Sequence, residues 1–258
     1  MASPSKGVYA AGSRDVQAQA HPEIAAGGYA QGDGTVEFYQ RVVAVLPEGG
    51  TVLDLGAGRG ELFHRKEEGL RRFLVRLGNK YSRRIGADVD PAVLSNPGLD
   101  EAKVIEAGQP LPFPDESFDL VLCDWVIEHV EAPEPFISEV RRVLKVGGWF
   151  CARTPNRWSY FSIGARLFSG AMESKILRKL QPSRQESDVF PKYYRLNTLG
   201  DISAALRPSE WLNATYAHNP NPSYHGNSAL LLRLLTLFQN LTPRALASVI
   251  LIFARRTA

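Results

Sequence analysis

Cysteine is scarce in this chain of 258 residues, which contains only Cys123 and Cys151. Two cysteines exclude a disulfide framework, and neither has a cysteine or histidine neighbour at the spacing of a zinc site. Both lie in apolar strand patterns, so we expect buried, reduced thiols and a cytoplasmic protein. Residues 1–33 lack the continuous apolar segment of a secretory signal and are rich in Ala, Gly and Ser, so we expect them to be disordered.

The sequence also lacks an apolar run long enough to span a bilayer. The strongest candidate, residues 229–241, holds nine Leu, Ala or Phe residues interrupted by Arg233, Thr236, Gln239 and Asn240. We expect this helix to pack on the rest of the protein or in a homo-oligomer interface. A helix lying on a membrane surface is the alternative.

The net charge of +3 conceals an asymmetry between the two parts of the chain. Residues 1–150 contain 16 Lys and Arg against 22 Asp and Glu, whereas residues 151–258 contain 14 against 5. The basic part suggests an acceptor with phosphate or carboxylate groups, or docking at an anionic surface, and a solvated basic surface explains it equally well. No basic run is dense enough, or sufficiently interleaved with aromatic residues, to favour a nucleic-acid partner.

A glycine-rich turn is the most informative feature that is present. The apolar run Thr51–Leu55 predicts a buried strand, and Gly56, Gly58 and Gly60 follow it, where glycine lets the backbone approach a ligand closely. Asp54 would repel the pyrophosphate of a dinucleotide and attract a cationic ammonium group. The G-x-G-x-G spacing also differs from the G-x-G-x-x-G dinucleotide fingerprint, which argues against an NAD-dependent oxidoreductase.

Four blocks of sequence carry a family resemblance: Val52–Glu61, Ile85–Pro91, Leu111–Asp124 and Arg141–Phe150. In this order and at these separations they resemble class I S-adenosylmethionine (SAM)-dependent methyltransferases, and most closely the type 11 group, over about residues 35–156. The resemblance implies SAM as cofactor and S-adenosyl-L-homocysteine as product. It also implies that Asp88 accepts hydrogen bonds from the two ribose hydroxyls.

The resemblance places the cofactor at the ends of the predicted strands. The residues expected to bind it are Asp54, Gly56, Ala57, Gly58, Gly60, Asp88, Val89, Glu106, Ala107, Gly108, Gln109, Asp124 and Trp125. The family's usual acid that binds the adenine amino group would fall at Ala107, and this chain has Glu106 one position earlier. Either Glu106 shifts inward, or Gln109 and the backbone of residues 107–108 bind the adenine.

Strands alternating with helices predict an α/β fold with a doubly wound, mainly parallel, Rossmann-like sheet. Seven strands are expected, near residues 51–55, 84–88, 103–106, 118–123, 148–153, 211–218 and 248–255. The domain should cover residues 34–258, with helical insertions at about 156–196 and 219–243 forming a substrate lobe over the site.

His129 is the candidate catalytic residue among the five histidines. It follows the fourth predicted strand, where family members present residues to the methyl acceptor, and histidine is a suitable general base near neutral pH. Some related O-methyltransferases bind a divalent metal here through Glu-x-x-Glu-His. This chain has Glu128 and His129 but Trp125 in place of the first glutamate, and two ligands are too few to predict a metal site. Glu128 is otherwise an orienting partner of His129 or a helix cap.

Further acceptor contacts are expected beyond the fifth strand and in the inserted lobe. They are Glu128, Asn156, Arg157, Tyr160, Tyr193, Tyr194 and Arg195. Helix capping by Asn156 and packing of the tyrosines are the structural alternatives. Residues 188–198 resemble a passage in type 11 enzymes of polysaccharide and secondary metabolism, which favours a sugar or polyhydroxylated acceptor.

The sequence therefore predicts a SAM-dependent O-methyltransferase acting on a hydroxyl of a small molecule or glycan by direct in-line transfer. N- or C-methylation on the same fold is one alternative, and a module that binds SAM without chemistry is another.

Overall fold

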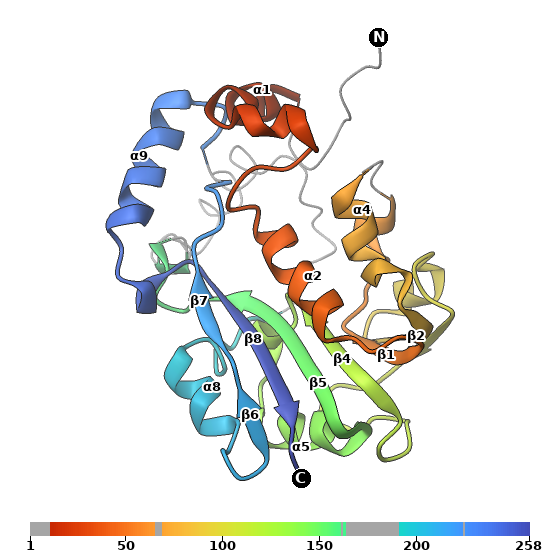
Figure 1. Ribbon diagram of the computed structural model, residues 1–258. Coiled ribbons are helices and arrows are strands. Elements are labelled where there is room, and N and C mark those ends of the chain that lie inside the picture. Colours follow the sequence, from red (N-terminus) through yellow and green to blue (C-terminus); the bar gives the residue numbers. More distant parts are fainter. Residues whose placement is uncertain (1–10, 65–68, 161, 164–190, 224) are drawn as a thin grey trace.

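The computed structural model describes residues 11–64, 69–160, 162–163, 191–223 and 225–258 (Figure 1). One twisted sheet runs through the molecule in the order β3-β2-β1-β4-β5-β8-β6, with β7 pairing with β8. Its strands are β1 (Gly50–Leu55), β2 (Tyr81–Asp88), β3 (Glu101–Val104), β4 (Phe118–Asp124), β5 (Leu144–Pro155), β6 (Trp211–Asn213), β7 (Tyr216–His218) and β8 (Val249–Arg256).

The first five strands are parallel, and β8 is antiparallel to β5, β6 and β7. The predicted α/β class with a mainly parallel, doubly wound sheet is confirmed. The expected seven strands become eight, because the single strand predicted over residues 211–218 is interrupted. Asn213 Oδ1 accepts a hydrogen bond from the Thr215 N–H at 3.0 Å, which bends the chain between β6 and β7.

The described helices are α1 (Ala11–Ala20), α2 (Gly34–Val45), α3 (Glu61–His64), α4 (Leu70–Val75), α5 (Pro133–Val143), α8 (Leu199–Ala205) and α9 (Ala229–Leu241). Short 3-10 turns are η1 (Pro22–Ala26), η2 (Leu77–Asn79), η3 (Pro91–Ser95), η4 (Ile127–His129) and η6 (Arg244–Leu246). Among these described residues, no helix is long and apolar enough to cross a bilayer.

Two apolar layers cover the faces of the sheet, because successive strand residues point to opposite sides. On one face, α2 and α4 pack on Leu120 and Leu122 of β4. On the other face, α5 and α8 pack on Val121 and Cys123. Both cysteines are buried and unpaired, as predicted. Both faces of the sheet are therefore covered by helices. In this architecture ligands bind at the carboxyl ends of the strands.

Residues 11–26, which we expected to be disordered, form α1 and η1. A polar contact explains the difference, since the fully buried Gln17 donates from Nε2 to the carbonyl oxygen of Pro222 at 2.9 Å and contacts His225 Nε2 at 3.1 Å. Composition cannot reveal an anchor between residues more than 200 positions apart. Residues 1–10 and, within the predicted substrate lobe, residues 161 and 164–190 lie outside the described residues.

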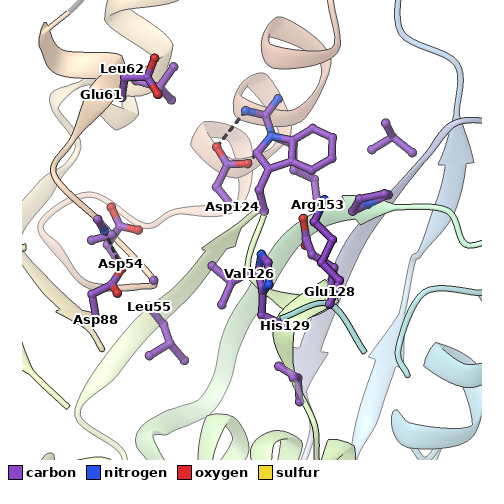
Figure 2. A pocket seen from close by; sticks show the side chains of 18 of the residues that line it. Asp54, Leu55, Glu61, Leu62, Asp88, Asp124, Val126, Glu128, His129 and Arg153 are labelled. Atoms are coloured by element: carbon purple, nitrogen blue, oxygen red, sulfur yellow. Dashed lines mark hydrogen bonds and ion pairs between the residues drawn. The ribbon is translucent and has the colours of Figure 1, made fainter. Parts of the chain in front are cut away.

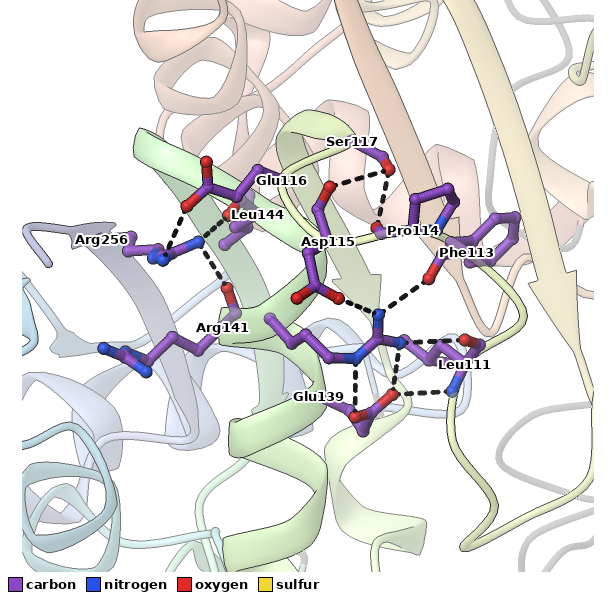
Figure 3. Close-up of polar contacts among 11 residues, drawn as sticks. Leu111, Phe113, Pro114, Asp115, Glu116, Ser117, Glu139, Arg141, Leu144 and Arg256 are labelled. Carbon is purple, nitrogen blue, oxygen red and sulfur yellow. Dashed lines mark hydrogen bonds and ion pairs between the residues drawn. The ribbon is translucent and has the colours of Figure 1, made fainter.

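One arginine of α5, Arg142, fixes the loop that joins the predicted adenine segment to β4. Figure 3 labels its contact partners Leu111, Phe113, Asp115 and Glu139. Arg142 donates to the carbonyl oxygens of Leu111 and Phe113 at 2.9 and 2.8 Å, and it pairs with the carboxylates of Asp115 and Glu139. Glu139 Oε2 in turn accepts the Leu111 N–H at 2.8 Å. The planar guanidinium can satisfy all these acceptors at once because its donors are arranged as a fork.

We expect Arg142→Lys to lower the free energy of unfolding by about 1–2 kcal/mol, because an ammonium group cannot make the same set of hydrogen bonds. Urea denaturation measures the change. The control is Arg141→Lys, since the Arg141 guanidinium makes a looser ion pair with Glu210, at 3.8 Å. This variant should cost less than about 0.5 kcal/mol. Equal losses in the two variants would contradict the anchoring role of Arg142.

Candidate cofactor and acceptor site

A cavity of about 1680 Å³ lies at the carboxyl ends of β1, β2, β4 and β5. In Figure 2, Asp54 and Asp88 lie on one side of it, and His129 and Glu128 lie on the other. All thirteen residues predicted to bind the cofactor line this cavity, from Asp54 and the glycine turn through Asp88, Val89 and residues 106–109 to Asp124 and Trp125. The residues come from the carboxyl ends of different strands of the sheet. Residues far apart in the sequence therefore meet in this cavity.

The three glycines of the turn have different structural roles, although each has a positive φ, of 79°, 49° and 74° for Gly56, Gly58 and Gly60. A Cβ added to Gly56 would lie 2.2 Å from Val126 Cγ2, and one added to Gly60 would lie 2.1 Å from Asn96 Oδ1. A Cβ at Gly58 would meet nothing nearer than Asp88 Oδ2 at 4.0 Å. Gly56 and Gly60 are therefore required by the packing of the protein itself, and Gly58 is the glycine that leaves open space.

Asp88 fixes the turn from the end of the neighbouring strand. Its Oδ2 accepts the Gly58 N–H at 2.7 Å, and its Oδ1 accepts the Asp90 N–H at 2.8 Å. A carboxylate oxygen can accept a second hydrogen bond, so both oxygens of Asp88 retain acceptor capacity toward a ligand.

Asn96 also holds the turn, and it was not singled out in the sequence. Its Nδ2 donates to the carbonyl oxygens of Ala57 and Gly58 at 2.9 and 3.1 Å, while its Oδ1 accepts the Gly98 N–H at 2.9 Å. Nothing in the local sequence marks an asparagine that acts 38 positions away.

Asp54 differs from our expectation, because its charge is already compensated. Its Oδ2 accepts from Nη2 and Nε of Arg84 on β2 at 2.6 and 3.1 Å, and both side chains are buried. Burial raises the pKa of Asp54, against the opposing effect of the Arg84 charge. An ammonium group of a ligand would thus meet a neutralised ion pair rather than a lone carboxylate.

Asp124 is neutralised in the same way at the end of β4. It forms a bidentate pair with Arg153 of β5 and accepts the Tyr39 hydroxyl at 2.9 Å. The Arg153 guanidinium also lies 5.3 Å from the centroid of the Trp125 ring, within range of a cation–π contact. Tyr39 and Arg153 both line the cavity and were missed, since only the strand register brings Arg153 beside Asp124.

Glu128 is buried and connects η4 to the segment at residues 193–194. Its Oε2 accepts the Thr154 hydroxyl at 3.0 Å, and its backbone oxygen accepts the N–H groups of Tyr193 and Tyr194 at 2.9 and 3.2 Å. Burial raises the pKa of Glu128 to about 7.

His129 is oriented by a backbone carbonyl. Its Nδ1 lies 2.7 Å from the carbonyl oxygen of Pro191, which can only accept a hydrogen bond. Nδ1 therefore carries the proton, and in the neutral ring Nε2 is the basic nitrogen. The ring lines the cavity.

The remaining predicted acceptor residues separate into two groups. Tyr160, Tyr193 and Tyr194 line the cavity with Glu128, whereas Asn156, Arg157 and Arg195 do not. Asn156 is fully buried, and its side chain donates to the carbonyl oxygen of Ala245 and accepts the Trp158 N–H. Asn156 therefore caps the backbone that follows it, which was the structural alternative to an acceptor contact.

Comparison with known proteins places this site in a family. A family model described as a methyltransferase domain matches residues 53–152. A probable SAM-dependent methyltransferase of Mycolicibacterium smegmatis is 41% identical over 79 residues, which cover 30% of this chain and 31% of that protein. A ubiquinone/menaquinone biosynthesis C-methyltransferase of Xanthomonas oryzae is 34% identical over 119 residues, covering 43% of this chain and 44% of the relative. The chain thus spans less than half the length of these curated relatives.

This chain contains a class I SAM-dependent methyltransferase domain of the type 11 group. A solved SAM-dependent methyltransferase from Mesorhizobium loti shares the fold, with a TM-score of 0.55 at 21% identity over 86% of this chain and 99% of that one. The family assignment predicted from the four sequence blocks is confirmed, and with it SAM as the cofactor and S-adenosyl-L-homocysteine as the product.

The methyltransferase site has room for this cofactor where the family places it. Besides the open space at Gly58, a Cβ added to Gly108 would meet no atom within 4 Å, so the backbone of the predicted adenine segment faces empty space. Asp88 offers acceptor capacity on both oxygens to the paired ribose hydroxyls. The residues present therefore fit SAM.

We expect Gly56→Ala to lower the free energy of unfolding by about 3 kcal/mol, because strain at positive φ adds to the clash with Val126. Gly108→Ala is the matched control, since its φ of 76° is nearly that of Gly56 and it has open space around it. The control should lose only about 1 kcal/mol in the same urea titration. Similar losses would show that packing against Val126 does not require Gly56.

The buried Glu128 predicts a pH dependence of stability. Its pKa is raised from 4.5 to about 7 in the folded state, so the proton-bound form favours folding. This contribution is fully present below pH 4.5 and is lost as the pH rises through about 7. Glu128→Gln mimics the protonated form and should remove the dependence, making the variant more stable relative to the wild type by up to about 3 kcal/mol above that range.

Urea denaturation of both proteins across this pH range gives the difference curve. A flat difference curve would contradict the raised pKa of Glu128.

Proposed function

We propose that the protein transfers the methyl group of SAM to a hydroxyl of a small molecule or glycan, with His129 as general base. The hydrogen bond from His129 Nδ1 to the Pro191 carbonyl carries this proposal, because it fixes the ring with Nε2 as the basic nitrogen at the cavity. A general base must lie within hydrogen-bond reach of the proton that it accepts, and His129 lines the cavity in which the acceptor would bind.

SAM supplies an electrophilic methyl group on a sulfonium, so the protein must chiefly position the acceptor and exclude water. In the proposed site, Asp88 and the backbone at Gly58 and residues 106–109 hold the nucleoside end. His129 Nε2 accepts the hydroxyl proton as the acceptor oxygen bonds to the methyl carbon and the carbon–sulfur bond breaks. The methylated acceptor, S-adenosyl-L-homocysteine and a protonated His129 result.

The acceptor would lie between His129 and the aromatic side chains of Tyr160, Tyr193 and Tyr194, which line the same cavity. Lys192 also lines it, and its charge would suit an acceptor with a phosphate or carboxylate group. The buried, unpaired state of both cysteines supports a reducing compartment, so we place the reaction in the cytoplasm.

C-methylation is a second candidate, favoured by the name of the Xanthomonas oryzae relative. An activated ring carbon is itself nucleophilic, and its methylation depends less on a base near the reacting atom. The two chemistries therefore differ in what they require of His129.

The deciding variant is His129→Asn, whose side-chain amide can still donate to the Pro191 carbonyl but cannot accept a proton as a base. We expect it to bind SAM like the wild type and to lose about 10²–10⁴-fold in kcat for methyl transfer. Transfer from labelled SAM to a panel of phosphorylated sugars, polyphenols and amines, with identification of the methylated atom, provides the readout.

Asp88→Ala is the complementary control, since it should abolish binding of SAM and S-adenosyl-L-homocysteine in calorimetric titration while circular dichroism confirms the fold. Full turnover by His129→Asn would overturn the base assignment and favour N- or C-methylation. Binding of SAM with no transfer to any acceptor of the panel would favour a non-catalytic binding module.

A further inference from the structure

The α9 helix exposes a continuous apolar stripe. Leu230, Leu234, Leu237 and Leu241 recur at intervals of three or four residues, so they lie on one side of the helix, and each is between 54% and 76% exposed. Phe238 beside them is 52% exposed. A row of large apolar side chains in water is uncommon on a soluble protein unless the row binds something.

The opposite side of α9 contacts the rest of the protein through a narrow strip. Leu232 and Gln239 are buried, and Gln239 Nε2 lies 3.3 Å from the Ser248 hydroxyl. Leu231, Leu235 and Gln239 also line the cavity that contains His129. The helix is therefore both a wall of the methyltransferase cavity and an outer ridge, which Figure 1 shows at the margin of the molecule.

A second segment extends this ridge. The Tyr160 and Phe238 rings lie 5.9 Å apart, and Asn156 Nδ2 donates to the Ala245 carbonyl oxygen in η6 at 2.9 Å. These contacts bring the exposed side chains of Trp158 and Leu246 to the same part of the molecule as the stripe. We call the stripe of α9 together with Phe238, Trp158 and Leu246 the α9 surface.

The segment that forms α9 and η6 carries charge of one sign. Residues 219–248 contain two arginines, Arg233 and Arg244, and no lysine, aspartate or glutamate. Arg233 lies in α9 and Arg244 begins η6, and both are exposed. Apolar side chains flanked by arginine without acidic residues suit an anionic lipid bilayer. A symmetric pair of copies would instead bring two positively charged surfaces together.

We propose that the α9 surface docks this protein onto anionic membranes, with the leucine stripe entering the interface and Arg233 and Arg244 facing lipid phosphates. Because α9 is also a wall of the cavity, docking brings that wall against the lipid. The proposal does not depend on the identity of the methyl acceptor, because it concerns only the outer surface.

Co-sedimentation of the full chain with vesicles tests the docking. Vesicles of phosphatidylcholine mixed with phosphatidylglycerol should bind the protein, and pure phosphatidylcholine should bind it more weakly. Replacing Leu230, Leu237 and Leu241 together by Gln should lower partitioning into the anionic vesicles by at least about tenfold. Arg233→Gln with Arg244→Gln should remove most of the preference for anionic lipid.

Leu94, Val146 and Leu212, which are 55–64% exposed and lie outside the α9 surface, provide a matched control. Their joint replacement by Gln should leave vesicle binding unchanged. SAM titration of each variant checks that the site is intact, so a failure of docking is distinguishable from a failure of the proposed function. Absence of vesicle binding by the wild type, or equal loss in both triple variants, would overturn the proposal. A third outcome would also overturn it. In this outcome the wild type is a dimer in sedimentation equilibrium and does not bind vesicles, and the α9 triple variant is a monomer.

Discussion

The fit of the glycine turn between Val126 and Asn96 is the constraint on which the site depends. β1 ends at Leu55, and the chain can turn there only because Gly56 and Gly60 have no side chain where Val126 and Asn96 already lie. The Gly56 N–H also donates to the Ala87 carbonyl oxygen at 2.6 Å. The turn thus ties together the chain segments that follow β1, β2 and β4, and all three of these segments contribute to the cavity wall. Protein packing, as much as ligand approach, explains why these positions hold glycine.

Two of the carboxylates that line the cavity are paired with arginines of the protein. Asp54 is paired with Arg84 and Asp124 with Arg153, and in each pair the two residues come from neighbouring strands. Buried ions of this kind need a partner, because removal from water is costly for a lone charge. Asp88 differs from these two carboxylates, because its oxygens meet backbone N–H groups rather than an arginine and keep acceptor capacity for hydroxyl groups.

Much of the scaffold could be predicted from sequence, because apolar strand patterns, the glycine turn and helix boundaries are local signals. The positions of Asp88 and His129 at strand ends followed from the same patterns. The ion-pair partners could not be predicted, since Arg84 and Arg153 become neighbours of Asp54 and Asp124 only through strand register. The interruption of the strand at residues 214–215 depends on one side-chain hydrogen bond, and α1 depends on the distant contact of Gln17 with Pro222. In each case the structure depends on a contact with a distant residue or on the hydrogen bond of one side chain, and neither leaves a local pattern in the sequence.

The hydrogen bonds from η4 to residues 191–194 bear on how such enzymes can be recombined. Pro191, Tyr193 and Tyr194 lie near the end of the lobe predicted over residues 156–196, yet they contact the backbone of Glu128 and the ring of His129. These residues therefore help to hold Glu128 and His129 in place, as residues of the core of the fold would. A chimera that imports a lobe from another methyltransferase should place its downstream junction before Pro191. A junction after Tyr194 would exchange the acceptor specificity and also discard the carbonyl that orients the histidine.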